Sequence, residues 1–202
     1  MIPELSKTVE PQRVGDLVHA LGVVAIPEFA SGSELESLQE EFQRLRGQNS
    51  SAIEDGPVNA GFVKIIHRER AALEVPTTNS FFSQTWMSDV TTRFFHRGLG
   101  PVNPVIYATQ EVPATEHVAQ DLHFDVIPSL KFLLYLKATT AENGAFACIP
   151  GSLSFSRLQR ARRGRRVSYR ERSFSRQHPF HNDWAEPVEG GAGTLIVFTT
   201  EL

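Results

Sequence analysis

His123 and Asp125 carry the clearest chemical signal in the sequence, in the run His123-Phe124-Asp125. Residues 122–127 are rich in β-formers and predict a strand. Residues i and i+2 of a strand point to the same face, so this spacing would place an imidazole and a carboxylate side by side. Two histidines and one carboxylate on one face of an iron ion leave three coordination positions open. The alternative interpretation is a surface or hydrogen-bonded His/Asp pair, because the short run also occurs by chance.

The other histidines are weaker candidates for the same metal. His181-Asn182-Asp183 repeats the spacing and His178 lies just before it, but the polar, proline-containing run around them is typical of a loop. The sequence favours surface or packing positions for the remaining candidates, which are His67, His96 and His117.

The secondary structure predicted to position these residues is mostly helical in the first part of the chain and mostly β in the second. Residues 14–21 have apolar side chains at helical spacing and end at Gly22, and residues 23–27 predict a short buried strand. A second helix is predicted with Ser33 as its N-cap, and a third over residues 80–95, while residues 47–61 predict a surface loop. Short strands are predicted afterwards, at residues 102–112, 122–127, 130–138, 145–149 and 194–198.

This order of elements predicts one domain over residues 1–202, with a mostly helical part at 1–100 and a β-rich core at 101–202. Helices followed by a series of strands favour a β-sandwich or barrel with flanking helices. Trp86 and Trp184 are expected to be packing residues.

Composition excludes several classes of protein. The chain has 202 residues, 41% hydrophobic and 21% charged, with a net charge of -3. These values are typical of a globular protein and argue against binding nucleic acid through bulk charge. The N-terminus does not resemble a secretory signal, and no apolar run approaches the roughly 20 residues that cross a bilayer. The single cysteine, Cys148, cannot form an internal disulfide, so we expect a cytoplasmic protein without a membrane partner.

Four elements in order resemble the phytanoyl-CoA dioxygenase (PhyH-like) family of Fe(II)- and 2-oxoglutarate-dependent oxygenases. The first is the H-x-D run, followed by an apolar strand and the turn Thr140-Ala141-Glu142-Asn143-Gly144. Next come Ile149-Pro150-Gly151-Ser152 and the strand Gly193-Thr194-Leu195-Ile196-Val197-Phe198. The opening run Leu21-Gly22-Val23-Val24-Ala25-Ile26-Pro27-Glu28-Phe29 is also similar to the family's pattern.

The resemblance implies a mainly β fold with flanking helices, a double-stranded β-helix of the jelly-roll or cupin kind. It implies that His123 and Asp125 are metal ligands and catalytic residues, and that iron(II), 2-oxoglutarate and O2 are used. Related halogenases replace the carboxylate with a small residue, so Asp125 favours hydroxylation or another oxidation.

The chain also departs from the family pattern. The family's second histidine ligand and its 2-oxoglutarate-binding arginine follow the last strand, whereas the printed sequence stops at Leu202. We therefore expect a β-helix that is incomplete at its C-terminus, cut before the strand with these residues. Leu153 stands where the family often has histidine.

Two residues are candidates for binding 2-oxoglutarate. Gln110 lies thirteen residues before His123, where related hydroxylases place a contacting amide. Lys131 lies on the strand after the H-x-D run and could offset part of the missing arginine's charge. The alternatives are an edge-strand amide bonded to backbone and an exposed lysine at a strand start.

An arginine-rich segment follows the Ile-Pro-Gly-Ser run. It could bind an acidic or carrier-linked substrate, although a solvated helix or loop is the simpler interpretation, and its few aromatics give little support for base stacking. Its arginines are Arg157, Arg160, Arg162, Arg163, Arg165, Arg166, Arg170, Arg172 and Arg176.

The sequence therefore predicts a dioxygenase that hydroxylates or otherwise oxidises a small organic molecule in secondary or lipid metabolism. The alternative is a non-catalytic binding protein, or an inactive fragment, that retains the oxygenase fold. The fold does not identify the substrate, and the sequence does not indicate an oligomeric state.

Overall fold

The computed structural model describes residues 1–46, 53–55, 62–96, 105–110, 129–163 and 182–201. Its helices are α1 (Pro11–Leu21), α2 (Gly32–Arg46), α3 (Arg68–Glu74), α4 (Pro76–Phe82), α5 (Thr85–Phe95) and α6 (Leu153–Arg163), with short 3-10 turns η3 (Ala141–Asn143) and η7 (Asn182–Trp184). Its strands are β1 (Val23–Ile26), β2 (Ile53–Asp55), β3 (Phe62–His67), β4 (Val105–Gln110), β5 (Leu130–Leu134), β6 (Ala147–Cys148), β7 (Glu186–Pro187) and β8 (Leu195–Thr199).

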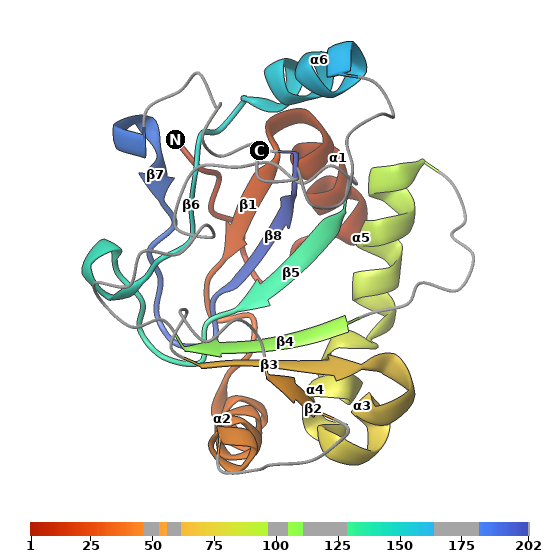
Figure 1. Ribbon diagram of the computed structural model, residues 1–202, viewed down its shortest axis with the longest axis vertical. Coiled ribbons are helices and arrows are strands. Elements are labelled where there is room, and N and C mark those ends of the chain that lie inside the picture. The colour runs from red at the N-terminus through yellow and green to blue at the C-terminus, as the bar shows by residue number, and fades with distance from the viewer. Residues whose placement is uncertain (47–52, 56–61, 97–104, 111–128, 164–181, 202) are drawn as a thin grey trace.

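The central sheet joins strands from opposite ends of the chain. Its order is β1-β8-β5, and both pairings are antiparallel. Val24 pairs with Val197, which pairs with Phe132 on the other side. The first hundred residues thus contribute a strand to the same sheet as the last strand described (Figure 1).

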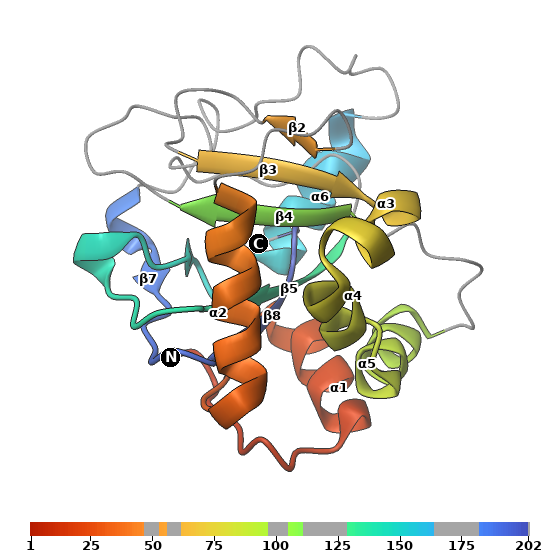
Figure 2. The same cartoon turned by 90° about the horizontal axis from the view of Figure 1, so that it is seen from below.

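Side chains alternate between the two faces of this sheet, as strand geometry requires. One face packs on the helices α1, α2 and α5, of which α1 and α5 lie side by side in Figure 2. The opposite face packs on β6, β7 and the start of α6. The first face carries Val24, Ile26, Leu195, Val197, Leu130, Phe132 and Leu134, and the second carries Val23, Ala25, Ile196, Phe198 and Leu133.

Helices α1 and α5 pack closely on the outside of the central sheet (Figure 1). Gly15 permits this approach, because a Cβ there would lie 2.7 Å from the Arg93 Cβ. Arg93 also donates to Asp16 through Nε at 2.7 Å and Nη2 at 3.0 Å. The hydrogen bond from Arg93 lowers the pKa of the Asp16 carboxyl.

A second sheet has the order β2-β3-β4 and crosses below the first in the view of Figure 1. Its strands are antiparallel, and β3 pairs along its whole length with β4, from Phe62 opposite Gln110 to His67 opposite Val105. A small third sheet pairs β6 with β7.

The structure corrects several predictions. Ser33 is not an N-cap, because α2 already begins at Gly32 and the Ser33 carbonyl accepts from Ser37 inside the helix. Within the predicted loop 47–61, residues 53–55 form β2 because they pair with β3. The predicted helix 80–95 is two helices that break between Phe82 and Thr85. Strand β3 and helix α3 were not predicted.

The two tryptophans differ. Trp86 packs as predicted: its ring contacts Phe29 and its indole N–H donates to the Val9 carbonyl. Trp184 is 57% exposed, so the expectation that it is a packing residue is wrong.

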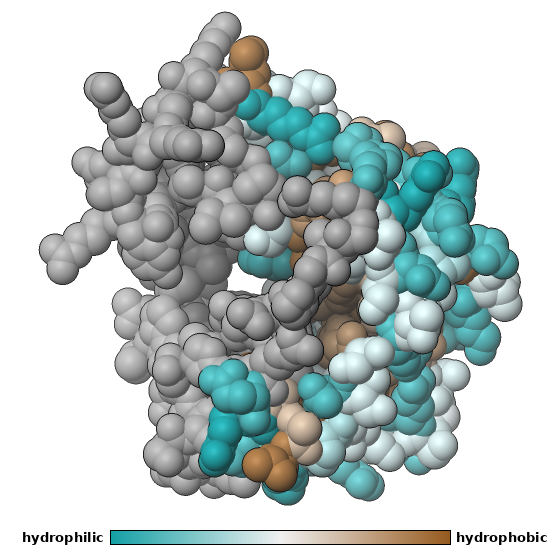
Figure 3. All heavy atoms as spheres, turned by 90° about the vertical axis from the view of Figure 1, so that its right-hand side faces the viewer, coloured by the Kyte–Doolittle hydropathy of each residue, from teal (hydrophilic) through white to brown (hydrophobic). Residues whose placement is uncertain are grey.

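The exposed surface of the described residues is mostly hydrophilic on the side that Figure 3 shows, with scattered apolar spheres. The large apolar side chains that are exposed are Met1, Leu73, Leu158 and Trp184. Among the helices that the structure describes, none has the length and apolarity that a membrane span requires.

Candidate functional site

The structure places two of the four predicted site residues. His123 and Asp125 lie outside the described residues, between the end of β4 and the start of β5. Gln110 is the last residue of β4, where its backbone pairs with Phe62. Lys131 is the second residue of β5 and is exposed.

The start of β5 locates the H-x-D run within limits set by chain length. Each residue extends a chain by at most about 3.6 Å, so the Asp125 Cα lies within about 14 Å of the Ser129 Cα. The same limit places His123 within about 22 Å of Ser129. Among the described residues after the H-x-D run, Ser129 is the first along the chain.

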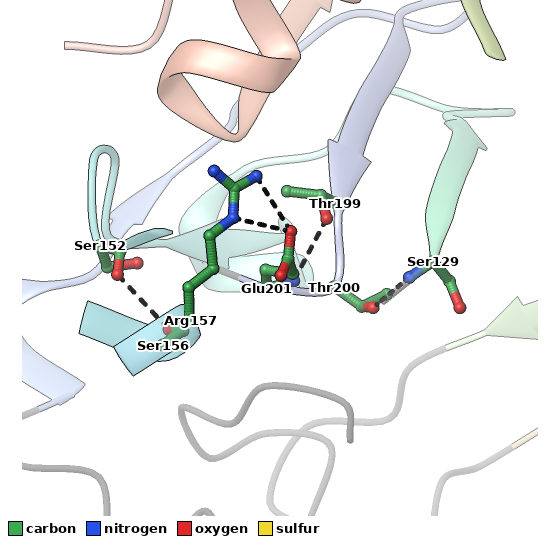
Figure 4. A network of polar contacts seen from close by, with 7 residues as sticks. All are labelled: Ser129, Ser152, Ser156, Arg157, Thr199, Thr200 and Glu201. Carbon is green, nitrogen blue, oxygen red and sulfur yellow. Dashed lines mark hydrogen bonds and ion pairs between the residues drawn. The ribbon is translucent and has the colours of Figure 1, made fainter. Parts of the chain in front are cut away.

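Ser129 and Thr200, the residue that follows β8, each donate one hydrogen bond to the other (Figure 4). The Thr200 N–H donates to the Ser129 carbonyl at 2.9 Å, and the Ser129 N–H donates to the Thr200 Oγ1 at 3.0 Å. The ladder continues with Leu130 opposite Thr199. The strand that follows the H-x-D run is thus fixed against the last residues of the chain.

Lys131 lies on one face of the central sheet with a row of apolar side chains. It pairs with Phe198, which pairs with Val23, and the next row on this face contains Leu133. The Phe198 ring lies 4.1 Å, centroid to centroid, from the ring of Phe146. The lysine therefore lies on the sheet face opposite to the one covered by helices, near the Ser129 end.

The Thr140–Gly144 turn has a structural explanation. The Asn143 side chain accepts from the Thr140 N–H at 2.7 Å and donates to the Ala138 carbonyl, which closes η3 as a capping box. Gly144 has φ +101°, a left-handed conformation that glycine adopts without steric cost. A hydrogen bond from Thr140 lowers the pKa of the exposed Glu142 carboxyl. This motif links β5 to β6.

The Ile-Pro-Gly-Ser run is also a turn, and it leads directly into α6. The Gly151 N–H donates to the Leu21 carbonyl at 3.1 Å, with φ +82° at Gly151. Leu153 is only 3% exposed and packs in the second core. At the position where the family often has histidine, this chain thus has an apolar packing residue.

Tyr135 is a buried polar residue that sequence reasoning missed. Its hydroxyl donates to the Val188 carbonyl at 2.8 Å and accepts from the Phe146 N–H at 2.9 Å. Burial raises the pKa of Tyr135 to about 12. Through these bonds β5 holds the segments that carry β6 and β7. The only signal was an aromatic residue at the end of an apolar strand.

A second missed feature joins α6 to the end of β8. Arg157 donates through Nε at 3.2 Å and Nη2 at 3.1 Å to one carboxylate oxygen of Glu201 (Figure 4). Glu201 is 5% exposed. The first arginine of the arginine-rich segment is therefore paired with a buried carboxylate, whereas the simpler sequence interpretation was a solvated residue.

Candidate metal ligands in the described part of the chain are dispersed. Within that part, no three His, Cys, Asp or Glu side chains gather closely enough to hold a metal ion. His96 ends α5, with its ring 4.7 Å from that of His19. His67 ends β3, while His117, His178 and His181 lie outside the described ranges, as do the arginines after Arg163.

Comparison with protein families gives one match over most of the chain. The model described as phytanoyl-CoA dioxygenase (PhyH) matches residues 18–202. A search of curated proteins gives no significant match.

Several solved structures share the fold at low sequence identity. The epimerase SnoN in complex with Fe3+, alpha ketoglutarate and nogalamycin RO has a TM-score of 0.63 at 14% identity, over 95% of this chain and 74% of that one. AviO1 from Streptomyces viridochromogenes Tue57 has a TM-score of 0.58 at 13% identity, over 96% and 86% of the two chains. EctD from S. alaskensis with bound Fe has a TM-score of 0.57 at 16% identity, over 98% and 74%.

Proposed function

Because this chain belongs to the phytanoyl-CoA dioxygenase family, as its motifs predict, we propose that it is the catalytic domain of an Fe(II)- and 2-oxoglutarate-dependent dioxygenase. The observation that carries the proposal is the pairing of Ser129 with Thr200, which fixes the strand after the H-x-D run against the end of β8. In the family pattern, these two places supply the metal ligands.

The proposed fold is a double-stranded β-helix over the single domain 1–202. Two three-stranded sheets, β1-β8-β5 and β2-β3-β4, support it. The similar folds of SnoN and EctD, whose structures hold iron, also support the proposed double-stranded β-helix. In such a fold the site lies between strands, and the helices α1, α2 and α5 cover the outside of one sheet.

His123 and Asp125 are the proposed metal ligands of this chain. An imidazole and a carboxylate suit iron(II), and their i, i+2 spacing lets one extended segment present both. The segment that holds them continues into Ser129 and β5, which are hydrogen-bonded along one side to β8 and Thr200. The donor set therefore fits iron, with the third protein ligand to come from the region that follows β8 in the family.

The proposed role of Lys131 and Gln110 is to bind 2-oxoglutarate. Lys131 is exposed on the face of the central sheet opposite to α1, α2 and α5, at the Ser129 end, where an ammonium group would attract a carboxylate. Gln110 ends the strand that precedes the H-x-D run and could supply an amide hydrogen bond. Both residues lie on strands that flank residues 111–128 in the sequence, the stretch that contains the H-x-D run, and this supports the assignment.

With iron, 2-oxoglutarate and O2 bound, the reaction oxidises a substrate C–H bond and converts 2-oxoglutarate to succinate and CO2. Asp125 favours hydroxylation or a related oxidation, because it would supply the carboxylate ligand that related halogenases replace with a small residue. The substrate is a small organic molecule, and the arginines that follow Arg157 in the sequence would suit one with an acidic group or an acidic carrier.

Succinate formation tests the proposal. The complete polypeptide that contains residues 1–202, with iron(II), ascorbate and 2-oxoglutarate, is expected to release succinate slowly even without its substrate. Asp125→Ala should abolish this release, and Lys131→Ala should raise the 2-oxoglutarate concentration needed for half-maximal release. His96→Asn is the matched control, because His96 ends α5 and lies on another element. Equal succinate release from the wild type and Asp125→Ala would refute the proposed function and leave a non-catalytic binding protein.

A further inference from the structure

The Glu201 carboxylate is buried beside the end of β8, and Arg157 is its partner. Glu201 is 5% exposed, and the Arg157 side chain is 39% exposed. Both Arg157 donors, Nε and Nη2, reach the same oxygen, Oε2, at 3.2 and 3.1 Å. One edge of the guanidinium therefore meets the carboxylate, and the Arg157 side chain as a whole is partly exposed.

A buried carboxylate without a cation is costly, because it has lost its hydration. Removal of Arg157 would take two charge-assisted hydrogen bonds from the buried Glu201 carboxylate. The ion pair therefore restrains the direction in which the chain leaves β8. This consequence concerns backbone position, and it holds whether or not the pair adds net stability.

The contacts of Glu201 and its neighbour extend to Ser129, at the start of β5. Glu201 follows Thr200, and Thr200 exchanges two hydrogen bonds with Ser129. Figure 4 shows these residues side by side, with Arg157 entering from α6. Ser129 is four residues after Asp125. One short chain of contacts thus links α6, the end of β8 and the start of β5.

The Arg157–Glu201 pair lies where α6 leaves the core. Its first turn is buried through Leu153 and Ser156, which are 3% and 0% exposed. One residue past Arg157, Leu158 is 47% exposed. Arg157 is thus the point at which the helix leaves the core, and its bond to Glu201 holds the helix against the sheet end.

We propose that Arg157 is a positioning residue for the metal site, which acts through Glu201 and the Thr200–Ser129 pair on the segment that holds His123 and Asp125. The inference rests on the proposed function. Arg157 touches neither metal nor substrate in this assignment. Arg157 affects the affinity of the site for metal by restraining the geometry of the metal ligands.

The test compares two ion pairs in the complete polypeptide. Arg157→Met removes the buried pair, and Arg93→Met removes the exposed Arg93–Asp16 pair, which has shorter contacts but joins α1 to α5. Iron(II) affinity is measured anaerobically, amide exchange at Ser129 by hydrogen exchange, and thermal unfolding on the same samples. We expect Arg157→Met to weaken iron(II) binding by about tenfold, as loss of supporting contacts to ligands does elsewhere, and to speed exchange at Ser129. Arg157→Lys keeps one donor and is expected to recover most of the affinity.

Arg93→Met is expected to leave iron(II) affinity unchanged, whatever it does to thermal unfolding. An Arg157→Met variant with wild-type affinity would overturn the inference, as would an equal loss in Arg93→Met. If Arg157→Met does not fold, Glu201→Gln replaces it, because it removes the charge and keeps the shape, and unchanged affinity there overturns the inference equally. Absence of iron(II) binding by the wild type would refute the proposed function itself, and the inference with it.

Discussion

Ser129 and Thr200 hold each other by two hydrogen bonds, although 71 residues separate them. The Thr200 N–H donates to the Ser129 carbonyl, and the Ser129 N–H donates to the Thr200 hydroxyl. The pair closes the β5–β8 ladder at the end from which the H-x-D run departs. The Thr200 hydroxyl therefore serves as the acceptor for the last N–H of the ladder, on Ser129, four residues after the proposed ligand Asp125.

Thr200→Val tests that role, because it keeps the branched shape and removes the acceptor for the Ser129 N–H. We expect the free energy of unfolding to fall by about 1 kcal/mol and amide exchange at Ser129 to accelerate. The measurement is urea unfolding together with hydrogen exchange. Thr92→Val, at an exposed position of α5, is the control and should change neither value. Unchanged exchange at Ser129 would show that the hydroxyl does not hold this residue.

Tyr135→Phe removes a hydroxyl that bonds to two other segments and leaves the ring in place. The variant leaves the Val188 carbonyl and the Phe146 N–H without this partner, so we expect a loss of about 1–3 kcal/mol in unfolding free energy. Denaturant unfolding measures it. A loss below a few tenths of a kcal/mol would mean that water replaces the hydroxyl without cost.

Glu41 caps a helix other than its own. Its carboxylate is 6% exposed and accepts from the Thr77 N–H at 3.0 Å and the Thr78 N–H at 2.7 Å, at the start of α4. Glu41→Gln should lower the free energy of unfolding by about 1–2 kcal/mol, because bonds to an ionised acceptor are the stronger ones. Glu40→Gln, on the adjacent exposed position, is expected to be neutral in the same thermal unfolding assay. Equal effects of the two variants would contradict the capping role.

Cys148 makes stability sensitive to alkaline pH. Burial, and secondly the charge of Glu186, raises the pKa of its thiol from 9.0 to about 12. The folded pKa lies above the unfolded one, so the stabilisation is complete below pH 9 and is lost as pH rises toward 12. We expect the free energy of unfolding to fall less steeply from pH 9 to pH 11 in Cys148→Ala than in the wild type. Parallel slopes would show that the thiol ionises equally in both states.

The sequence predicted those elements whose signal is local. The apolar runs at Val23–Ile26 and Leu195–Thr199 are buried strands because nearly every side chain in them meets the core. Gly22 ends α1 with φ +93°, as its position predicts. Pro76 starts α4 and separates it from α3, a signal that was present but was not used.

The remaining features depend on residues far apart in sequence. Strand β3 owes its conformation to its pairing with β4, and β2 to its pairing with β3, which no short window reveals. The Arg157–Glu201 pair spans 44 residues, and the arginine-rich run gave no sign of which member would be paired. For His123 and Asp125, the motif remains the basis of the prediction, and the structure adds the anchoring of Ser129, four residues after Asp125.

The most direct test of the account is the iron(II) affinity of the complete polypeptide, measured by anaerobic titration in the presence of 2-oxoglutarate. The account predicts one tight iron(II) site per chain in the wild type and in His96→Asn, and loss of that site in His123→Ala and in Asp125→Ala. Tight binding that survives both ligand substitutions, or no binding in the wild type, would contradict it.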